Sequence, residues 1–144
     1  FGVLKSNKEI DIIVNTELTK ISKAHGLEVV FHRAFDFCSD PIVGLSQLIE
    51  MGVDRLLTSG QEPKAIDGKD MIQQLVELSK GRIEIMAGSG VMPENAETLI
   101  STGVDAIHFT AGKFESEVQL GMGAKLILDE EKIASIMKFK KWES

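Results

Sequence analysis

Short apolar runs alternate with longer amphipathic segments along most of this chain. Residues 27–31, 54–60, 82–88 and 105–112 are short runs rich in large apolar side chains, and three of the four end in glycine. Their length, β-branched content and flanking glycines favour strands over helix fragments. Between the runs, apolar residues recur every three or four positions, which predicts helices. These residues are Ile12, Ile13, Leu18 and Ile21; Val43, Leu45, Leu48 and Ile49; Ile72, Leu75, Val76 and Leu78; Ala96, Leu99 and Ile100; and Ile133, Ile136 and Met137.

Capping signals mark both ends of the predicted helices. Helix starts are indicated by Asp40 before Pro41, by Asp70, by Met92 before Pro93, and by Asp129 before an acidic turn. Glycine follows each of the first four helices, at positions 26, 52, 81 and 103. A left-handed residue commonly ends a helix there, so these glycines predict the helix C-termini.

The chain also repeats part of itself. The segments "MGVDRLLTSG" and "TGVDAIHFTAG" share Gly-Val-Asp at positions 51 residues apart, which is two strand-helix units. Strands that alternate with helices at this spacing predict a parallel sheet with right-handed crossovers. The repetition favours a TIM-type (β/α)8 barrel over an open doubly wound sheet, which usually shows one Gly-rich turn and a reversal of strand order.

The length of the chain limits how much of a barrel it can form. A complete barrel needs more than about 200 residues, whereas the chain has 144. The four runs and the apolar residues 1–4 account for about five strands. We therefore expect one domain, residues 1–144, that is the C-terminal part of a barrel whose first three units are absent from this sequence.

Strand alternation predicts which side chains line the barrel interior. Aligning three of the strands on Gly60, Gly88 and Gly112 produces two sets of side chains on opposite faces. The more polar set is assigned to the interior: Leu56, Thr58, Glu84, Met86, His108 and Thr110. The more apolar set is expected to face the helices: Arg55, Leu57, Ile83, Ile85, Ile107 and Phe109. In the first strand, Val30 and His32 are expected to face inward, with Val29 and Phe31 facing outward.

The strongest candidate site follows the first of these runs, where His32, Arg33, Asp36 and Cys38 come together. Active sites of barrels lie at the C-terminal ends of the strands. His32 can serve as an acid-base group or a metal ligand, and Arg33 can hold an anion bidentately. The alternative is a structural network in which Arg33 pairs with Asp36.

Two further strand ends carry polar or glycine-rich loops. Gly88, Ser89 and Gly90 lead directly into a helix, and Gly112 ends the last run, so both loops are candidates for an anion site. The alternative is that these glycines only serve tight turns. Ser59, Gly60 and Gln61 form a third candidate, although the absence of Gly-x-Ser-x-Gly around Ser59 argues against a serine hydrolase.

His108 and Glu84 are expected to face inward from neighbouring strands. A buried carboxylate is costly without a partner, so the two side chains are expected to pair. The pair is either structural or catalytic, with His108 as the catalytic group.

Composition narrows the classes of partner. The net charge is −6, the pI is about 5.1 and the chain has no tyrosine, so binding to nucleic acid is not expected. A single cysteine excludes an internal disulfide and fits a reducing cytosol. No apolar run approaches the roughly 20 residues of a membrane helix, so no membrane partner is expected.

Four segments in this order and spacing, "FHRAFD", "GVDRLLTSGQ", "IMAGSGV" and "HFTAG", resemble the CutC copper homeostasis family over nearly the whole chain. The resemblance implies a cytoplasmic barrel with a role in copper homeostasis and with Cu(I) binding or trafficking. It also implies a pocket made of His32, Arg33, Asp36, Ser59, Gly60, Gln61, Gly88, Ser89, Gly90 and His108.

Cys38 is the candidate copper ligand, and an ordinary buried cysteine is the alternative. Two rival functions use the same pocket: an enzyme that acts on a phosphorylated or carboxylated small molecule, and a non-enzymatic protein that binds such a ligand. The sequence leaves a homo-oligomer open.

Overall fold

Four parallel strands form the central sheet, in the spatial order β1-β2-β3-β4. The strands are β1 (Val30–Phe31), β2 (Arg55–Thr58), β3 (Glu84–Gly88) and β4 (Ala106–His108). The computed structural model describes residues 1–115 and 125–139. All four predicted runs contribute a strand, and each pairs with its neighbour along the chain as the alternation of strands and helices predicted.

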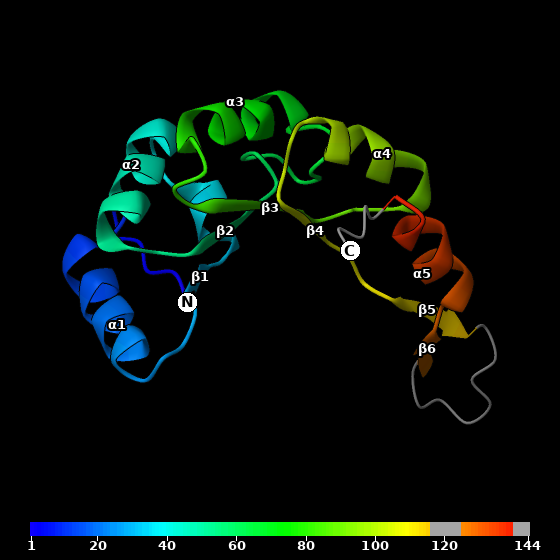
Figure 1. The fold of residues 1–144 in the computed structure, drawn as a ribbon, viewed down its shortest axis with the longest axis horizontal. Helices are drawn as coiled ribbons and strands as arrows, with labels where there is room; N and C mark the ends of the chain where they lie inside the picture. The colour runs from blue at the N-terminus through cyan, green and yellow to red at the C-terminus, as the bar shows by residue number, and fades with distance from the viewer. Residues whose placement is uncertain (116–124, 140–144) are drawn as a thin grey trace.

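The described residues form five α-helices, which lie along the outer side of the strands. They are α1 (Ile12–Ala24), α2 (Pro41–Met51), α3 (Lys69–Ser79), α4 (Pro93–Ser101) and α5 (Glu130–Met137), and a short 3-10 helix, η1 (Arg33–Phe37), follows β1. Figure 1 shows the helices along the outer side of an arc and β1 to β4 along its inner side. This is the arrangement of part of a (β/α) barrel wall, as predicted.

Most of the predicted helix ends are confirmed. The side chains of Asp40 and Asp129 accept hydrogen bonds from the first-turn amides of α2 and α5, and Pro93 is the first residue of α4. The four predicted glycines all have positive φ, between 69° and 87°. The start of α3 differs slightly, because its N-cap is Gly68 and Asp70 lies within the first turn.

The faces of β3 and β4 are as predicted, but those of β2 are reversed. Leu56 pairs in register with Ile85, and Thr58 pairs with Ala87, and all four side chains are buried on the helix side. The predicted alignment set Gly60 level with Gly88, whereas the observed register pairs Thr58 with Ala87 and so places Gly88 level with Ser59, one residue earlier. A shift of one residue exchanges the faces of a whole strand.

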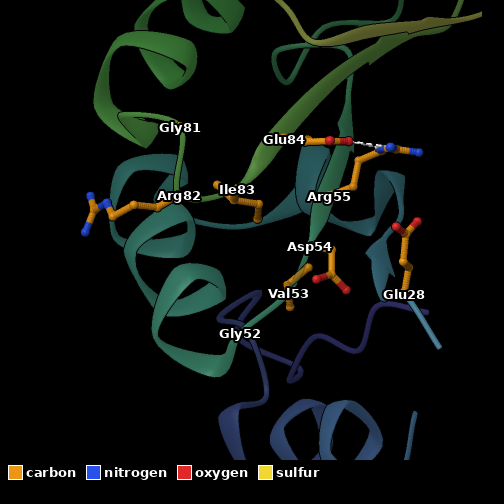
Figure 2. Close-up of a pocket in the computed structure, with 9 residues that line it drawn as sticks. All are labelled: Glu28, Gly52, Val53, Asp54, Arg55, Gly81, Arg82, Ile83 and Glu84. Carbon is orange, nitrogen blue, oxygen red and sulfur yellow. Dashed lines mark hydrogen bonds and ion pairs between the residues drawn. The ribbon is translucent and has the colours of Figure 1, made fainter. Parts of the chain in front are cut away.

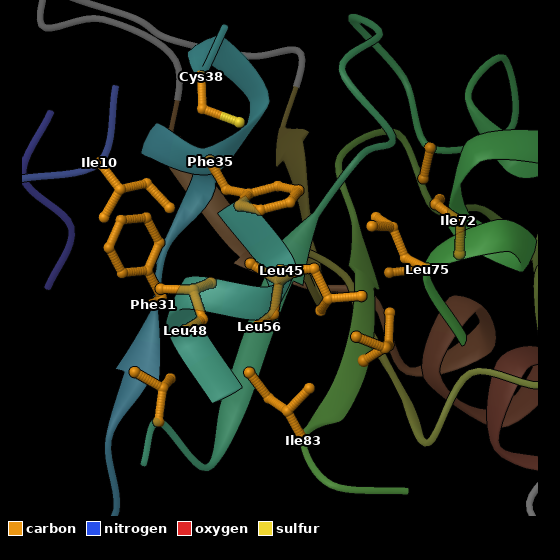
Figure 3. Close-up of a cluster of buried hydrophobic side chains, with 14 of the residues drawn as sticks. Ile10, Phe31, Phe35, Cys38, Leu45, Leu48, Leu56, Ile72, Leu75 and Ile83 are labelled. Atoms are coloured by element: carbon orange, nitrogen blue, oxygen red, sulfur yellow. The ribbon is translucent and has the colours of Figure 1, made fainter. Parts of the chain in front are cut away.

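The hydrophobic core lies between the sheet and the helices (Figure 3). Phe31 and Leu56 contribute to it from the strands, and Leu45, Leu48 and Leu75 from the helices. Each of these five side chains is at most 2% exposed. Complete burial of a large apolar side chain stabilises a fold by about 1.5–3 kcal/mol, so this layer holds the helices against the strands.

The repeated Gly-Val-Asp sequence has a structural explanation. The carboxylate of Asp54, just before β2, accepts a hydrogen bond from the amide of Val29 at 2.7 Å. The carboxylate of Asp105, just before β4, accepts one from the amide of Ile85 at 2.8 Å. In both copies the aspartate therefore attaches the start of one strand to the start of its neighbour.

Segment 1–4 is not a full strand. Phe1 alone runs alongside β1, where its carbonyl accepts from the His32 amide at 2.9 Å, and Leu4 forms an isolated antiparallel bridge with Ile10. After β4, a two-stranded antiparallel sheet that the sequence did not predict is formed by β5 (Gly112–Glu115) and β6 (Lys125–Leu128).

Helix α1 also buries a different face from the one its apolar residues indicate. Ile13 and Ile21 are 81% and 53% exposed, whereas the polar Asn15 and Thr19 are buried. The reason is that the Asn15 side chain donates to the carbonyl of Val3 at 2.8 Å and accepts from its amide at 3.1 Å. This polar attachment turns α1 toward the N-terminal segment.

Candidate functional site

Polar residues gather where β1, β2 and β3 end, on the edge of the sheet that we call the rim. Because the strands are parallel, their C-terminal ends meet at the same edge of the sheet. His32 and Arg33 follow β1, Ser59 follows β2, and Gly88 ends β3. The predicted convergence of these residues on one edge is therefore confirmed.

The 3-10 helix η1 positions the first group of rim residues. Its Phe35 is fully buried in the core, which fixes the turn against the sheet. The ring nitrogen Nδ1 of His32 caps the turn by accepting from the Ala34 amide at 3.1 Å. Arg33 and Asp36 lie three residues apart in this turn and form an ion pair, with Nε 2.8 Å from Oδ2.

The Asp36 carboxylate is the centre of the rim, and its side chain is only 3% exposed. Besides the hydrogen bond from Arg33, it accepts one from the Thr58 hydroxyl at 2.5 Å and one from the backbone amide of Gln61 at 3.2 Å. It also accepts from the amide and the hydroxyl of Ser59, each at 3.0 Å. The structural network that was the alternative interpretation therefore exists, and it joins the turn after β1 to the loop after β2.

Arg33 is the cation that this network orients. Its Nη2 donates to the Ser59 hydroxyl at 2.7 Å and to the Glu62 carbonyl at 3.4 Å. The arginine side chain is 37% exposed, while Ser59 is completely buried. Ser59 therefore lies behind the guanidinium, which is the group that faces solvent.

Cys38 is buried beside the network. A methyl group added at Gly44 would lie 3.5 Å from Sγ of Cys38. The side-chain nitrogen Nε2 of Gln61 lies 3.7 Å from Sγ and donates to the Cys38 carbonyl at 2.7 Å. Burial raises the pKa of the thiol from 9.0 to about 11, and the nearby carboxylates of Asp40 and Asp36 add to the increase. The protonated thiol is therefore the stable form at neutral pH.

The loop after β2 connects the rim of β1 to that of β3. We call residues 61–67 the β2 loop; it is closed where Gly60 and Gly68 touch, since a methyl group on Gly60 would collide with the Gly68 carbonyl. The carbonyl of Pro63 accepts from the Ser89 hydroxyl at 2.7 Å, and the Ala65 amide donates to the Ser89 carbonyl at 3.0 Å.

Sequence reasoning missed the β2 loop. The signal that could have indicated it is the pair of glycines eight residues apart, followed directly by a helix. Two of its contact residues, Gln61 and Ser89, have φ of 64° and 88°, which is unusual for side chains other than glycine. Such strain persists only where surrounding contacts hold it. Here the Gln61 side chain donates to the carbonyl of Cys38, and the Ser89 side chain donates to the carbonyl of Pro63 in the loop.

His108 and Gly112 lie apart from the Asp36 network. His108 is exposed at the end of β4 and pairs in register with Gly88, and β4 is three strands from β1, or roughly 14 Å at about 4.8 Å a strand. Gly112 begins β5, in the second sheet. The structure therefore separates both from His32.

The predicted pair of His108 and Glu84 is wrong. Glu84 is the first residue of β3, and its carboxylate pairs with Arg55, with Nε 2.6 Å from Oε2. His108 is level with Gly88 at the other end of the same strand. The two residues do share the inner face, but four residues of strand separate them.

A cavity of about 370 Å³ lies at the opposite end of the sheet from the rim (Figure 2). It is lined by the segments that lead into β2 and β3, including Asp54, Arg55 and Glu84. In barrels this end of the strands serves stability rather than catalysis. The Arg55–Glu84 pair and the attachment of Asp54 to Val29 agree with that role.

Two structural features bear on partners. Among residues 1–115 and 125–139, no three His, Cys, Asp or Glu side chains are grouped so as to hold a metal ion. Over the same residues, no helix has the length and apolar character needed to cross a membrane.

Residues 1–113 match the model of the CutC family. The chain belongs to the CutC family. A CutC family protein of Glaesserella parasuis is 44% identical over 96% of this chain, and one of Histophilus somni is 50% identical over 83%. The chain spans 61% and 49% of the length of these two CutC relatives.

Solved structures agree with the family and the fold. CutC from Streptococcus agalactiae, provisionally described as a copper homeostasis protein, is 37% identical with a TM-score of 0.68; the match covers 75% of this chain and 53% of that one. A structure described as native KDPGal is 18% identical with a TM-score of 0.60 and covers 91% of this chain and 54% of that one. The second likeness concerns the fold alone.

Proposed function

We propose that this chain belongs to a cytoplasmic protein of copper homeostasis, and that its rim binds a small anion that carries phosphate or carboxylate. Membership of the CutC family and the description of the Streptococcus agalactiae relative support the cellular role. One observation carries the ligand class: the half-exposed guanidinium of Arg33, held at the strand ends by Asp36 and Ser59.

Arg33 suits an anionic ligand because its geometry is already set. A guanidinium has five donors in a planar fork that matches carboxylate and phosphate oxygens. Asp36 and Ser59 engage Nε and Nη2, and within the described part of the chain Nη1 donates to no residue. A ligand at Nη1 therefore meets an oriented donor and does not have to displace the Asp36 pair.

His32 is the residue that would transfer a proton to or from this ligand if the protein is an enzyme. Its Nδ1 accepts from the Ala34 amide, so the neutral ring carries its proton on Nε2. An exposed imidazole beside an anion site is suited to general acid-base catalysis. In the enzymatic version of the proposal, His32 transfers a proton to or from the bound molecule; in the binding version, the same pocket only holds it.

In this proposal copper is cargo and not a resident cofactor, because Cys38 does not fit a Cu(I) site. Cu(I) prefers soft thiolate ligands, whereas Cys38 is 6% exposed and its thiol pKa is raised to about 11. It is also the single cysteine of the chain. A pair of thiolate ligands for Cu(I) would then have to come from another subunit or from outside these residues.

The ligand class is tested by titrating the protein calorimetrically with inorganic phosphate and with acetate. We expect saturable binding that Arg33→Gln weakens by at least tenfold and that Arg33→Lys restores in part, with circular dichroism confirming that both variants fold. Phosphate and acetate affinities that do not change in Arg33→Gln would contradict the proposal. Turnover of a ligand found in this way, lost in His32→Ala while binding persists, would favour the enzyme over the binding protein.

The copper role is tested separately by competition with a Cu(I) chelator. We expect Cys38→Ser to bind Cu(I) with the same stoichiometry and affinity as the wild-type protein, because the buried thiol is not available. Loss of one Cu(I) equivalent in Cys38→Ser would show that Cys38 is a ligand after all.

A further inference from the structure

The Arg33 site raises a question of charge. Arg33 is in direct contact with the buried carboxylate of Asp36, so the pair carries no net charge. An anion that binds there gains oriented hydrogen bonds but little net Coulomb attraction. A phosphate dianion would need a second cation nearby that is not already paired.

The β2 loop supplies this second cation, Lys64. The Lys64 side chain lies across the turn after β3, because a methyl group added at Gly90 would be 3.0 Å from Cγ of Lys64, 3.2 Å from Cβ and 3.3 Å from Cδ. Gly90 has no side chain and a φ of 65°, so the lysine chain can pass over its backbone. Lys64 is exposed, and it forms no ion pair with any residue in the described ranges.

The loop that carries Lys64 is attached on both sides. On one side the carbonyl of Glu62 accepts from the hydroxyl of Ser59 and from Arg33 Nη2. On the other side the Ser89 hydroxyl and carbonyl bind the loop at Pro63 and Ala65, and Ala65 is completely buried. Lys64 lies between these attachments, so its backbone is fixed at the rim between the ends of β1 and β3.

We infer that Lys64 is a second cationic residue of the anion site, and that the site therefore selects a dianion such as a phosphate monoester over a monocarboxylate. This inference rests on the proposed function of Arg33. Arg33 contributes directed hydrogen bonds, and Lys64 contributes the uncompensated charge. The acidic side chains of the same loop, Glu62 and Asp67, are exposed and form no ion pair with Lys64 in the part of the chain that the structure describes.

Lys64→Gln tests the inference, because it removes the charge from an exposed side chain and keeps most of its length. Lys69→Gln is the matched control: Lys69 is five residues away at the start of α3, where it pairs with Asp70 at the surface. Inorganic phosphate and acetate are titrated into the wild-type protein, Lys64→Gln, Lys69→Gln and Arg33→Gln at constant ionic strength.

We expect Lys64→Gln to weaken phosphate binding about tenfold and acetate binding about twofold, whereas Lys69→Gln changes neither. In titrations repeated at several salt concentrations, Lys64→Gln should also reduce the salt dependence of phosphate binding, because it removes a charge–charge attraction that salt screens. Phosphate affinity that falls in Arg33→Gln but is unchanged in Lys64→Gln would overturn the role of Lys64 and leave the Arg33 site standing. Phosphate affinity unchanged in Arg33→Gln would overturn the site itself. Equal losses of phosphate affinity in Lys64→Gln and Lys69→Gln would overturn the specific role of Lys64, because the loss would then follow from the overall charge of the protein.

Discussion

At the scale of single residues, the rim separates side chains that face solvent from side chains that support them. Arg33 and His32 are open to solvent, whereas Asp36 and Ser59 are buried behind them. Polar residues at strand ends can all look like ligand contacts. Here the buried ones, Asp36 and Ser59, hold the exposed Arg33 in position, as is usual for binding sites whose side chains are held in place before the ligand binds.

Asp36 is the supporting residue whose change has the clearest consequence. We expect Asp36→Asn to lower the free energy of unfolding by about 2–3 kcal/mol, because it removes the ion pair with Arg33 and leaves buried donors with poorer partners. Urea denaturation followed by circular dichroism measures this. Asp67→Asn, an exposed position on the β2 loop, is the control and should change stability by less than about 0.5 kcal/mol. Equal stability of the two variants would remove Asp36 from the centre of the network.

At the scale of elements, two devices join neighbouring strands and loops. The repeated aspartates attach strand starts to one another at the base of the sheet, and the contact between Gly60 and Gly68 closes the β2 loop at the rim. Each device depends on a residue type that hydrophobic patterning does not detect.

The base of the sheet is expected to be sensitive to acid through Asp54. A hydrogen bond from Lys23, mainly, holds the pKa of this carboxyl below its usual value. A lowered folded-state pKa stabilises the protein above the unfolded pKa of about 4, and that contribution is lost as the pH falls through the folded value. The pair is partly exposed, so Asp54→Asn should cost about 0.5–1 kcal/mol at pH 7.

The check is a double-mutant cycle of Asp54→Asn and Lys23→Gln, measured by urea denaturation at pH 7 and pH 3. The coupling energy should be present at pH 7 and smaller at pH 3. A coupling energy of zero at pH 7 would mean that the ion pair contributes nothing to stability, and a coupling that is the same at both pH values would mean that it does not depend on the charge of Asp54.

The β2 loop is expected to be sensitive at Gly68. A methyl group there would collide with the backbone carbonyl of Ser59, which cannot move without breaking the Asp36 network. We expect Gly68→Ala to destabilise the protein by about 2–3 kcal/mol, as overpacking does in a close contact. Gly81→Ala is the control, because a methyl group at Gly81 meets no atom within 4 Å. In thermal unfolding, the melting temperature of Gly81→Ala should fall only by the modest cost of placing alanine at a positive φ. A larger loss at Gly81 would contradict this reading of the loop.

At the scale of the whole molecule, the described residues form an arc with helices outside and strands inside (Figure 1). The chain covers about half of its CutC relatives and of the solved CutC structure. The inner face of the arc therefore carries partly exposed side chains such as Leu57 and Met86, at positions that point into the interior of a complete barrel.

The charge of the whole chain leads to a prediction about partners. With a net charge of −6, the protein should not bind duplex DNA, because nucleic-acid binding needs a basic surface that neutralises phosphates. We expect no shift of a labelled duplex in an electrophoretic assay at 150 mM salt and micromolar protein. A retarded band that disappears on raising the salt would contradict this expectation.

The periodic features of the sequence were sufficient for the fold class and for most of the elements. The strands of the central sheet, the helices of the described residues and the rim were predictable, because alternation, helical spacing and capping residues act locally, whereas the strand expected at residues 1–4 is wrong and the β5–β6 sheet was not predicted. The register of β2 was not, since Gly60 and Gly88 look equivalent in sequence, whereas in the sheet Gly88 is level with Ser59. Nor was the buried face of α1, because the attachment of Asn15 to Val3 overrides its apolar pattern.

The sequence by itself determined that the parallel strands end in polar residues on one edge, since a helix after each of β1, β2 and β3 returns the chain to the start of the next strand. Only the tertiary structure decided which of those residues meet. Asp36, Ser59 and Glu62 converge on Arg33, and Lys64 crosses Gly90. Such contacts join segments that are distant along the chain, and they depend on strand order and loop closure, which no local pattern encodes.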